Sequence, residues 1–276
     1  MKNPVAKIYR SGGGLLLVLV AYLFVKCAAN TAAATNEVIF PHGHFLGLVY
    51  SEDNPAFNSS GSFSAECTKN GAFSADLRLG GKRNAFSGRF SSSGAFSGSV
   101  GRGTNSLEVS IQMDLNSGTN CTGTISNGTW SADLVAYRAS AGRNVARAPG
   151  TDPGRYPIRI VVREDLTPGP TNEGFGTIRL LPSRVAHVRG TLGDGAKFSQ
   201  STIICGNQLP FYSALYDHRG SIFGWITFNP VSRTNGLGGV PIISPPGPFG
   251  NVSWFKSAGI DSNYPSGFSF QTIVGQ

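Results

Sequence analysis

Charged residues are scarce in this 276-residue chain, since Asp, Glu, Lys and Arg make up only 14% of it, against about 25% in a typical globular domain. Cysteine and histidine number four each, and no Cys-x-x-Cys pair is present, which excludes a zinc ribbon or a dithiol redox motif. No segment combines Glu, Lys, Leu and Ala at a helical period, so a coiled coil or a helical bundle is excluded too. Aromatic residues, at 11% of the chain, exceed what disordered chains contain.

The N-terminus has the order of a secretory signal peptide. Residues 1–10 carry three cations and no acid, an apolar run follows over residues 15–25, and small residues lead to Ala34. The apolar run is about half of the ~20 residues that cross a bilayer as a helix. We therefore expect residues 1–34 to be a signal peptide, cleaved after Ala34 or Ala29, and the mature chain to be periplasmic, displayed at the cell surface or extracellular.

Three cysteines remain once the signal peptide is removed, Cys67, Cys121 and Cys205. Cys67 and Cys121 lie in strand-like segments of the first half, so a disulfide between them is possible and would contribute about 4 kcal/mol by the chain-entropy model. The alternative is that all three are small buried apolar side chains. Cys27 could carry a lipid, although Lys26 stands where a lipoprotein site has Gly or Ala.

Alternation of apolar and polar residues dominates the mature chain. From Ser106 to Leu115 every second residue is apolar and the residues between them are polar. A strand with one dry face and one wet face has this period, whereas a helix would scatter the apolar residues around its circumference. The pattern recurs over residues 73–79, 130–134 and 158–163. The sequence therefore predicts an all-β protein.

A short motif repeats through the first half: a turn residue, a small residue, an aromatic residue, Ser, and then Ala or Gly. Its aromatic positions are Phe63, Phe73, Phe86, Phe96 and Trp130. Gly or Asn permits a tight turn, the ring begins the next inward face, and the small residue that follows leaves room for a neighbouring ring. The spacing of the motif is typical of a meander of short strands.

The strand candidates fall into two equal sets of about eight, separated by a stretch rich in Gly, Ala, Pro and Arg. We predict two tandem antiparallel eight-stranded halves, barrel-like or sandwich-like, that arose by internal duplication. The predicted boundaries are an N-terminal β domain over residues 35–139, a linker over 140–154 and a C-terminal β domain over 155–276. A single mixed assembly of all the strands is the alternative.

The polar residues show no pattern that catalysis requires. No Gly-x-Ser-x-Gly elbow stands between a strand and a helix, and His42 and His44 lack a third ligand nearby. We therefore predict no catalytic residue, no metal and no cofactor, and an enzyme is the less favoured class. Paired carboxylates of a glycan-active hydrolase stay possible, because such pairing is spatial. The cations are spread along the mature chain, which argues against a nucleic-acid groove.

The richest aromatic segment lies in the second half, where both faces of residues 220–228 are apolar. Such a strand either packs between the two halves or presents its rings to a partner. If the rings are presented to a partner, five aromatic residues are candidates for binding a protein or a glycan at the cell surface: Phe223, Trp225, Tyr212, Tyr216 and Trp254.

The Gly-x-Phe-Ser-Gly repeats, with the runs over residues 190–201, 210–216 and 224–225, resemble the Gly/Phe/Ser-rich tandem β modules of exported bacterial cell-surface proteins. The resemblance covers nearly all of the mature chain and implies no catalytic residues. We therefore expect a non-enzymatic module that binds or scaffolds at the cell envelope through its loops and the aromatic surface of its second half, and that meets the membrane only through the signal segment. The alternative is a barrel-type carrier of a small apolar ligand.

Overall fold

The computed structural model of the protein describes residues 38–52, 55–101, 106–139, 146–162, 169–229, 232–235, 241–244, 247–260 and 262–276. The predicted signal peptide lies outside these residues, as does the first part of the predicted linker. Residues from Ile39 to the C-terminus form one compact unit. Strands make up its regular structure, apart from one short 3-10 helix over Phe57–Ser59 in the described residues.

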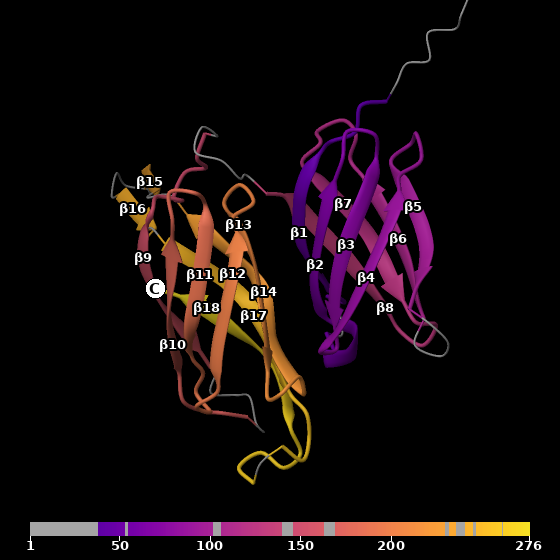
Figure 1. Cartoon of the computed structure of the whole chain (residues 1–276). Coiled ribbons are helices and arrows are strands. Elements are labelled where there is room, and N and C mark those ends of the chain that lie inside the picture. Colours follow the sequence, from indigo (N-terminus) through magenta and orange to yellow (C-terminus); the bar gives the residue numbers. More distant parts are fainter. Residues whose placement is uncertain are drawn as a thin grey trace, which may run out of the picture. The chain divides into compact units, whose positions relative to one another are not determined.

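The first half is one sheet of eight antiparallel strands, coloured indigo to magenta in Figure 1. Its strands are β1 (Gly43–Tyr50), β2 (Gly61–Cys67), β3 (Ala72–Leu79), β4 (Lys82–Arg89), β5 (Ala95–Val100), β6 (Leu107–Met113), β7 (Asn120–Ser126) and β8 (Ser131–Arg138). The order in the sheet is β4-β3-β2-β1-β8-β7-β6-β5. The first strand pairs with the last, which leaves β4 and β5 as the two edges. These edges approach each other through the rings of Phe86 and Phe96, so the sheet forms a nearly closed barrel.

The second half repeats this topology. Its sheet contains β9 (Gly154–Val161), β10 (Gly174–Leu180), β11 (Val185–Thr191), β12 (Lys197–Ile203), β13 (Gln208–Leu215), β14 (Gly220–Asn229), β17 (Gly247–Lys256) and β18 (Phe268–Gly275). The order β12-β11-β10-β9-β18-β17-β14-β13 matches that of the first sheet strand for strand. A two-stranded hairpin of β15 (Ser232–Asn235) and β16 (Pro241–Ser244) is inserted between β14 and β17. The predicted all-β fold of two tandem eight-stranded halves is confirmed, while the domain boundaries stay a prediction.

The interior of the first half follows the period of two. In β6 every second side chain is buried and the others are exposed, as the alternation predicts. The repeated aromatic residues point inward, and the rings of Phe73 and Phe96 meet edge to face with their centroids 4.9 Å apart. A Cβ atom at Gly88 would lie 2.4 Å from the Phe96 ring. Glycine at position 88 is therefore needed to make space for the neighbouring ring.

The two barrels differ at the seam where the edge strands face each other. In the first half the rings of Phe86 and Phe96 stack across the seam, with their centroids 6.2 Å apart. In the second half the Gln200 amide joins β12 to β13: its Nε2 donates to the Pro210 carbonyl at 3.0 Å, and its Oε1 accepts from the Tyr212 amide at 3.0 Å. One side chain thus satisfies backbone groups that a strand ladder would otherwise pair.

A polar network is buried inside the second barrel. Trp254, which is fully buried, donates from Nε1 to the Tyr216 hydroxyl at 2.9 Å. That hydroxyl donates in turn to Oδ2 of Asp194 at 2.6 Å. The Lys256 ammonium lies 3.5 Å from the same oxygen and sits over the rings of Tyr216 and Tyr264. The charge of each buried group is therefore compensated by a partner, as burial requires.

Candidate functional site

The predicted aromatic surface of the second half is covered in the structure. Phe223 is 1% exposed and Tyr212 is 7% exposed, and both belong to a cluster with Leu48 of β1 and Phe255 of β17. The ring of Tyr50 from the first half packs on Phe223 at 5.7 Å between centroids. These rings therefore pack between residues of the two halves, which was the alternative interpretation of the segment.

The remaining candidate rings are also engaged within the protein. Trp225 is half-buried and meets the Tyr137 ring edge to face at 5.3 Å. Tyr216 and Trp254 belong to the interior network described above. Binding of a partner by any of the five rings stays a prediction.

The three described cysteines are buried free thiols, so the possible disulfide between Cys67 and Cys121 is not formed in the structure. Burial raises the pKa of each of the three thiols, Cys205 included, to about 12. The Cys67 thiol adds to the effect on Cys121 by charge repulsion, which places the two near each other. Thiols with such pKa values stay protonated at neutral pH and are poor nucleophiles.

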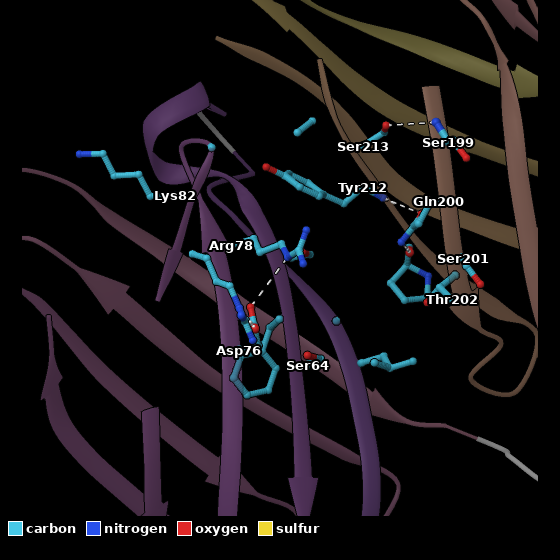
Figure 2. A pocket seen from close by; sticks show the side chains of 18 of the residues that line it. Ser64, Asp76, Arg78, Lys82, Ser199, Gln200, Ser201, Thr202, Tyr212 and Ser213 are labelled. Carbon is cyan, nitrogen blue, oxygen red and sulfur yellow. Dashed lines mark hydrogen bonds and ion pairs between the residues drawn. The ribbon is translucent and has the colours of Figure 1, made fainter. Parts of the chain in front are cut away.

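A polar cleft of about 730 Å³ lies between outer faces of the two halves (Figure 2). One wall is formed by β2, β3 and β4. The period of two directs polar side chains outward there, with Ser64 opposite Asp76 and Ser62 opposite Arg78 in the β2–β3 register. The wall therefore offers hydroxyl groups beside a carboxylate and a guanidinium.

The other wall is formed by β12 and β13. Ser199 and Ser201 lie on the outward positions of β12, and the Ser199 amide donates to the Ser213 hydroxyl at 3.4 Å. Figure 2 shows Ser199, Gln200 and Tyr212 across the cleft from Asp76 and Arg78. This wall carries hydroxyl groups and the seam-bridging amide, and the residues of β12 and β13 that line the cleft are uncharged.

The charge of the cleft is positive. Asp76 is the one carboxylate among the described residues that line it, and it pairs with Arg83 and, at 3.8 Å, with Arg78. Lys82 adds a further cation. Burial raises the pKa of the Tyr212 hydroxyl, and the nearby Arg78 partly opposes that effect. The cleft can thus donate hydrogen bonds from guanidinium and hydroxyl groups to an oxygen-rich ligand.

Apart from Tyr212, which is among the rings named from the sequence and lines the cleft, sequence reasoning did not find these residues. Their outward positions on alternating strands are those of an ordinary solvated face, and no motif distinguishes Ser64 or Ser201 from other serines of the chain. The cleft arises because a face built from residues 62–83 meets a face built from residues 199–218. Within the described ranges, no group of three or more His, Cys, Asp and Glu residues is placed to hold a metal ion. No helix in the described part of the chain is long and apolar enough to cross a membrane.

No family model matches the chain, and no curated protein matches it. Among solved structures, the chain is similar to a protein of unknown function from the DUF3598 family of Nostoc punctiforme. That similarity has 14% identity and a TM-score of 0.22 over 84% of this chain and 94% of the other. A second similarity, to the intact N and C lobes of Ap-TbpB, has 10% identity and a TM-score of 0.18 over 86% of this chain and 60% of the other. At these TM-scores neither similarity bears on what the chain does.

Proposed function

We propose that the protein is an exported, non-enzymatic binding module of the cell envelope, and that its polar cleft holds a glycan. The order of basic, apolar and small residues at the N-terminus supports export. The resemblance of the Gly/Phe/Ser repeats to cell-surface β modules supports a place at the envelope. The observation that carries the proposal is the cleft itself, because it gathers hydroxyl, amide and guanidinium groups from two walls.

The chemistry of the cleft favours a sugar over an apolar ligand. A sugar presents many hydroxyl groups, each of which donates and accepts, and the serines of both walls can do the same. The half-buried side chains of Ile203 and Ala214 add a small apolar surface on the β12–β13 side, which suits the C–H face of a sugar ring. Binding sites for small molecules combine such a surface with a few placed polar groups.

The packing of the barrels supports a site on the outside of the strands. Inward side chains form a continuous hydrophobic cluster in each half. The second half includes rings as large as Trp254, Phe211 and Phe228, all fully buried. A barrel of about eight strands is just wide enough for its own side chains to fill it. This packing favours the cleft over the alternative of a ligand carried inside a barrel.

The single carboxylate of the described cleft supports binding without hydrolysis. Glycoside hydrolases use two carboxyl groups on opposite sides of the scissile bond. Asp76 is held by two arginines, and the described residues that line the cleft include no second carboxylate that could act opposite it. We therefore expect a bound glycan to be released unchanged.

The test is binding of the purified protein to a panel of bacterial surface polysaccharides. In the variant Ser64→Trp a bulky ring would fill the cleft beside Asp76, so glycan binding should be lost. The control Ser110→Trp places the same ring on an outward position of β6, outside the cleft, and should bind like the unaltered protein. Absence of binding to every polysaccharide, or equal binding by both variants, would contradict the proposal. Chemical change of a bound glycan would contradict the non-enzymatic assignment.

Export has a separate test. We expect the protein recovered from cells that express the full chain to begin after Ala34 or Ala29, as N-terminal sequencing would show. Recovery in the cytoplasm with Met1 or Lys2 still at the N-terminus would contradict export and leave the binding proposal to stand on the cleft alone.

A further inference from the structure

Three neighbouring strands of the second barrel carry a cluster of arginines on their outer face. The alternation of β9, β10 and β11 directs Arg155, Arg179 and Arg189 outward, and all three are exposed. The register places Arg155 opposite Arg179, and Arg179 opposite His187. Arg189 lies two residues beyond His187 on the same face of β11, opposite Thr177. Strand pairing thus brings together three arginines that lie 10 to 34 residues apart in the sequence. We call this patch the arginine cluster (Arg155, Arg179 and Arg189).

The arginine cluster borders a depression of about 310 Å³. Its lining includes the three arginines and His187, with the hydroxyl groups of Thr177 and Ser199. The patch is therefore concave, and it places guanidinium and hydroxyl donors around one space.

The positive charge of the arginine cluster is not neutralised by the described residues. No described carboxylate forms an ion pair with Arg155, Arg179 or Arg189. Arg159 on the same face shows the contrast, because its Nε and Nη2 donate to both carboxylate oxygens of Glu173 at 2.6–3.0 Å. Like charges directly opposite each other on paired strands repel, so Arg155 and Arg179 destabilise the sheet unless an anion lies between them.

We propose that the arginine cluster binds the sulfate or phosphate groups of an anionic polysaccharide. Guanidinium groups match the oxygens of such groups with two parallel hydrogen bonds, and the charge strengthens each bond. Thr177 and Ser199 can bond the sugar hydroxyls beside the anion. The site goes beyond the proposed function, because it lies on one barrel and does not require that the cleft hold a glycan.

Other polyanions fit this face less well. Single-stranded nucleic acids bind to platforms of several stacked rings, whereas Phe175, 59% exposed, is the single exposed ring on the described outer face of β9–β12. A membrane surface needs several apolar side chains that enter the lipid boundary, whereas Phe175 is the one large apolar side chain exposed among the described residues of this face, with the smaller Pro157 on β9. A hydroxyl-bearing polysaccharide uses both kinds of donor that the depression provides.

The test is titration of the whole protein with a sulfated heparin octasaccharide and with a phosphorylated mannan, each beside its unmodified counterpart. We expect at least one of the two anionic probes to bind and its counterpart to bind more weakly. A triple variant should weaken that binding about tenfold or more, because the charged hydrogen bonds of all three arginines are lost. It carries Arg155→Gln, Arg179→Gln and Arg189→Gln. The matched control carries the same loss of charge on the first half and should bind normally: Lys69→Gln, Arg89→Gln, Arg138→Gln.

Several outcomes would overturn the site. Equal binding by the arginine-cluster variant and the unaltered protein would do so, as would equal weakening in the control variant. Tighter binding of single-stranded DNA or of anionic lipid vesicles through the same arginines would replace the polysaccharide as occupant. The single variant Arg179→Gln should raise the Tm of the protein without ligand, because it removes the repulsion between Arg179 and Arg155. A fall in Tm would contradict the claim that these two charges repel each other without a compensating carboxylate. The cleft variant Ser64→Trp should keep its affinity for the anionic probe, so failure of the cleft and failure of the arginine cluster are distinguishable.

Discussion

The buried ion pair of the second barrel is the interaction whose removal should affect stability most sharply. The side chains of Lys256 and Asp194 are 2% and 3% exposed, and their charged atoms lie 3.5 Å apart. The Asp194 carboxylate also accepts from the Tyr216 hydroxyl, to which Trp254 donates. Replacing Lys256 by Met keeps the length of the side chain and leaves the carboxylate buried without its cation.

The expected cost follows from the burial of the pair. Breaking a buried ion pair by removing one partner costs about 3–5 kcal/mol, because the other charge is left uncompensated. We expect this cost for Lys256→Met and for Asp194→Asn. The double variant removes both charges, so its cost should be smaller than the sum of the two single costs by about 3 kcal/mol. As a control, Arg159→Met breaks the more exposed pair with Glu173, whose side chains are 54% and 30% exposed, and should cost only about 0.2–1 kcal/mol.

Urea denaturation followed by tryptophan fluorescence would measure all four free energies of unfolding. The denaturant slope must stay constant across the variants for the comparison to hold. Single costs that add to within about 0.5 kcal/mol would show that Lys256 and Asp194 are not coupled, and that the buried network does not stabilise the barrel as one unit.

Three further perturbations test other parts of the fold. Gln200→Ala should lower the free energy of unfolding by about 2 kcal/mol, because two buried backbone groups at the seam lose their partner, and faster amide exchange along β13 would locate the loss. Gly88→Ala should cost about 1–3 kcal/mol by overpacking, whereas Gly154→Ala, where a Cβ atom meets nothing closer than 3.8 Å, should stay within about 0.5 kcal/mol. Raising the pH from 8 to 10 should lower the free energy of unfolding by about 1.4 kcal/mol for each buried thiol. The reason is that the pKa of each thiol is about 12 in the fold and 9.0 in the free side chain, so stability present below pH 9 is lost as the pH rises toward 12. Replacing the three cysteines by Ala should flatten this dependence, and an unchanged slope would assign it to other groups.

The strand pattern of each half was predictable from the sequence. Alternation in β6 and the repeated aromatic motif depend only on residues close together in the chain, and burial of one face of a strand imposes the period of two wherever the strand lies. Equal sets of strands on either side of a Gly/Pro-rich stretch indicated two repeated halves, and the two identical strand orders agree with that.

The candidate sites were not predictable in the same way. Whether Phe223 faces a partner or lies beneath Tyr50 depends on a contact between residues more than 170 positions apart. The row of Arg155, Arg179 and His187 exists only because of the registers of two strand pairs, and a shift of one residue in either register would direct those side chains to the other face.

The sequence by itself determined that this chain forms pleated strands with rings inside and hydroxyl groups outside, because that division follows from the free energy of burying apolar surface at alternate positions. Tertiary structure alone decided which outward residues become a cleft or a charged patch. Those residues look like any solvated face until strand pairing and packing bring them together, and the pairing is set by contacts distant in sequence.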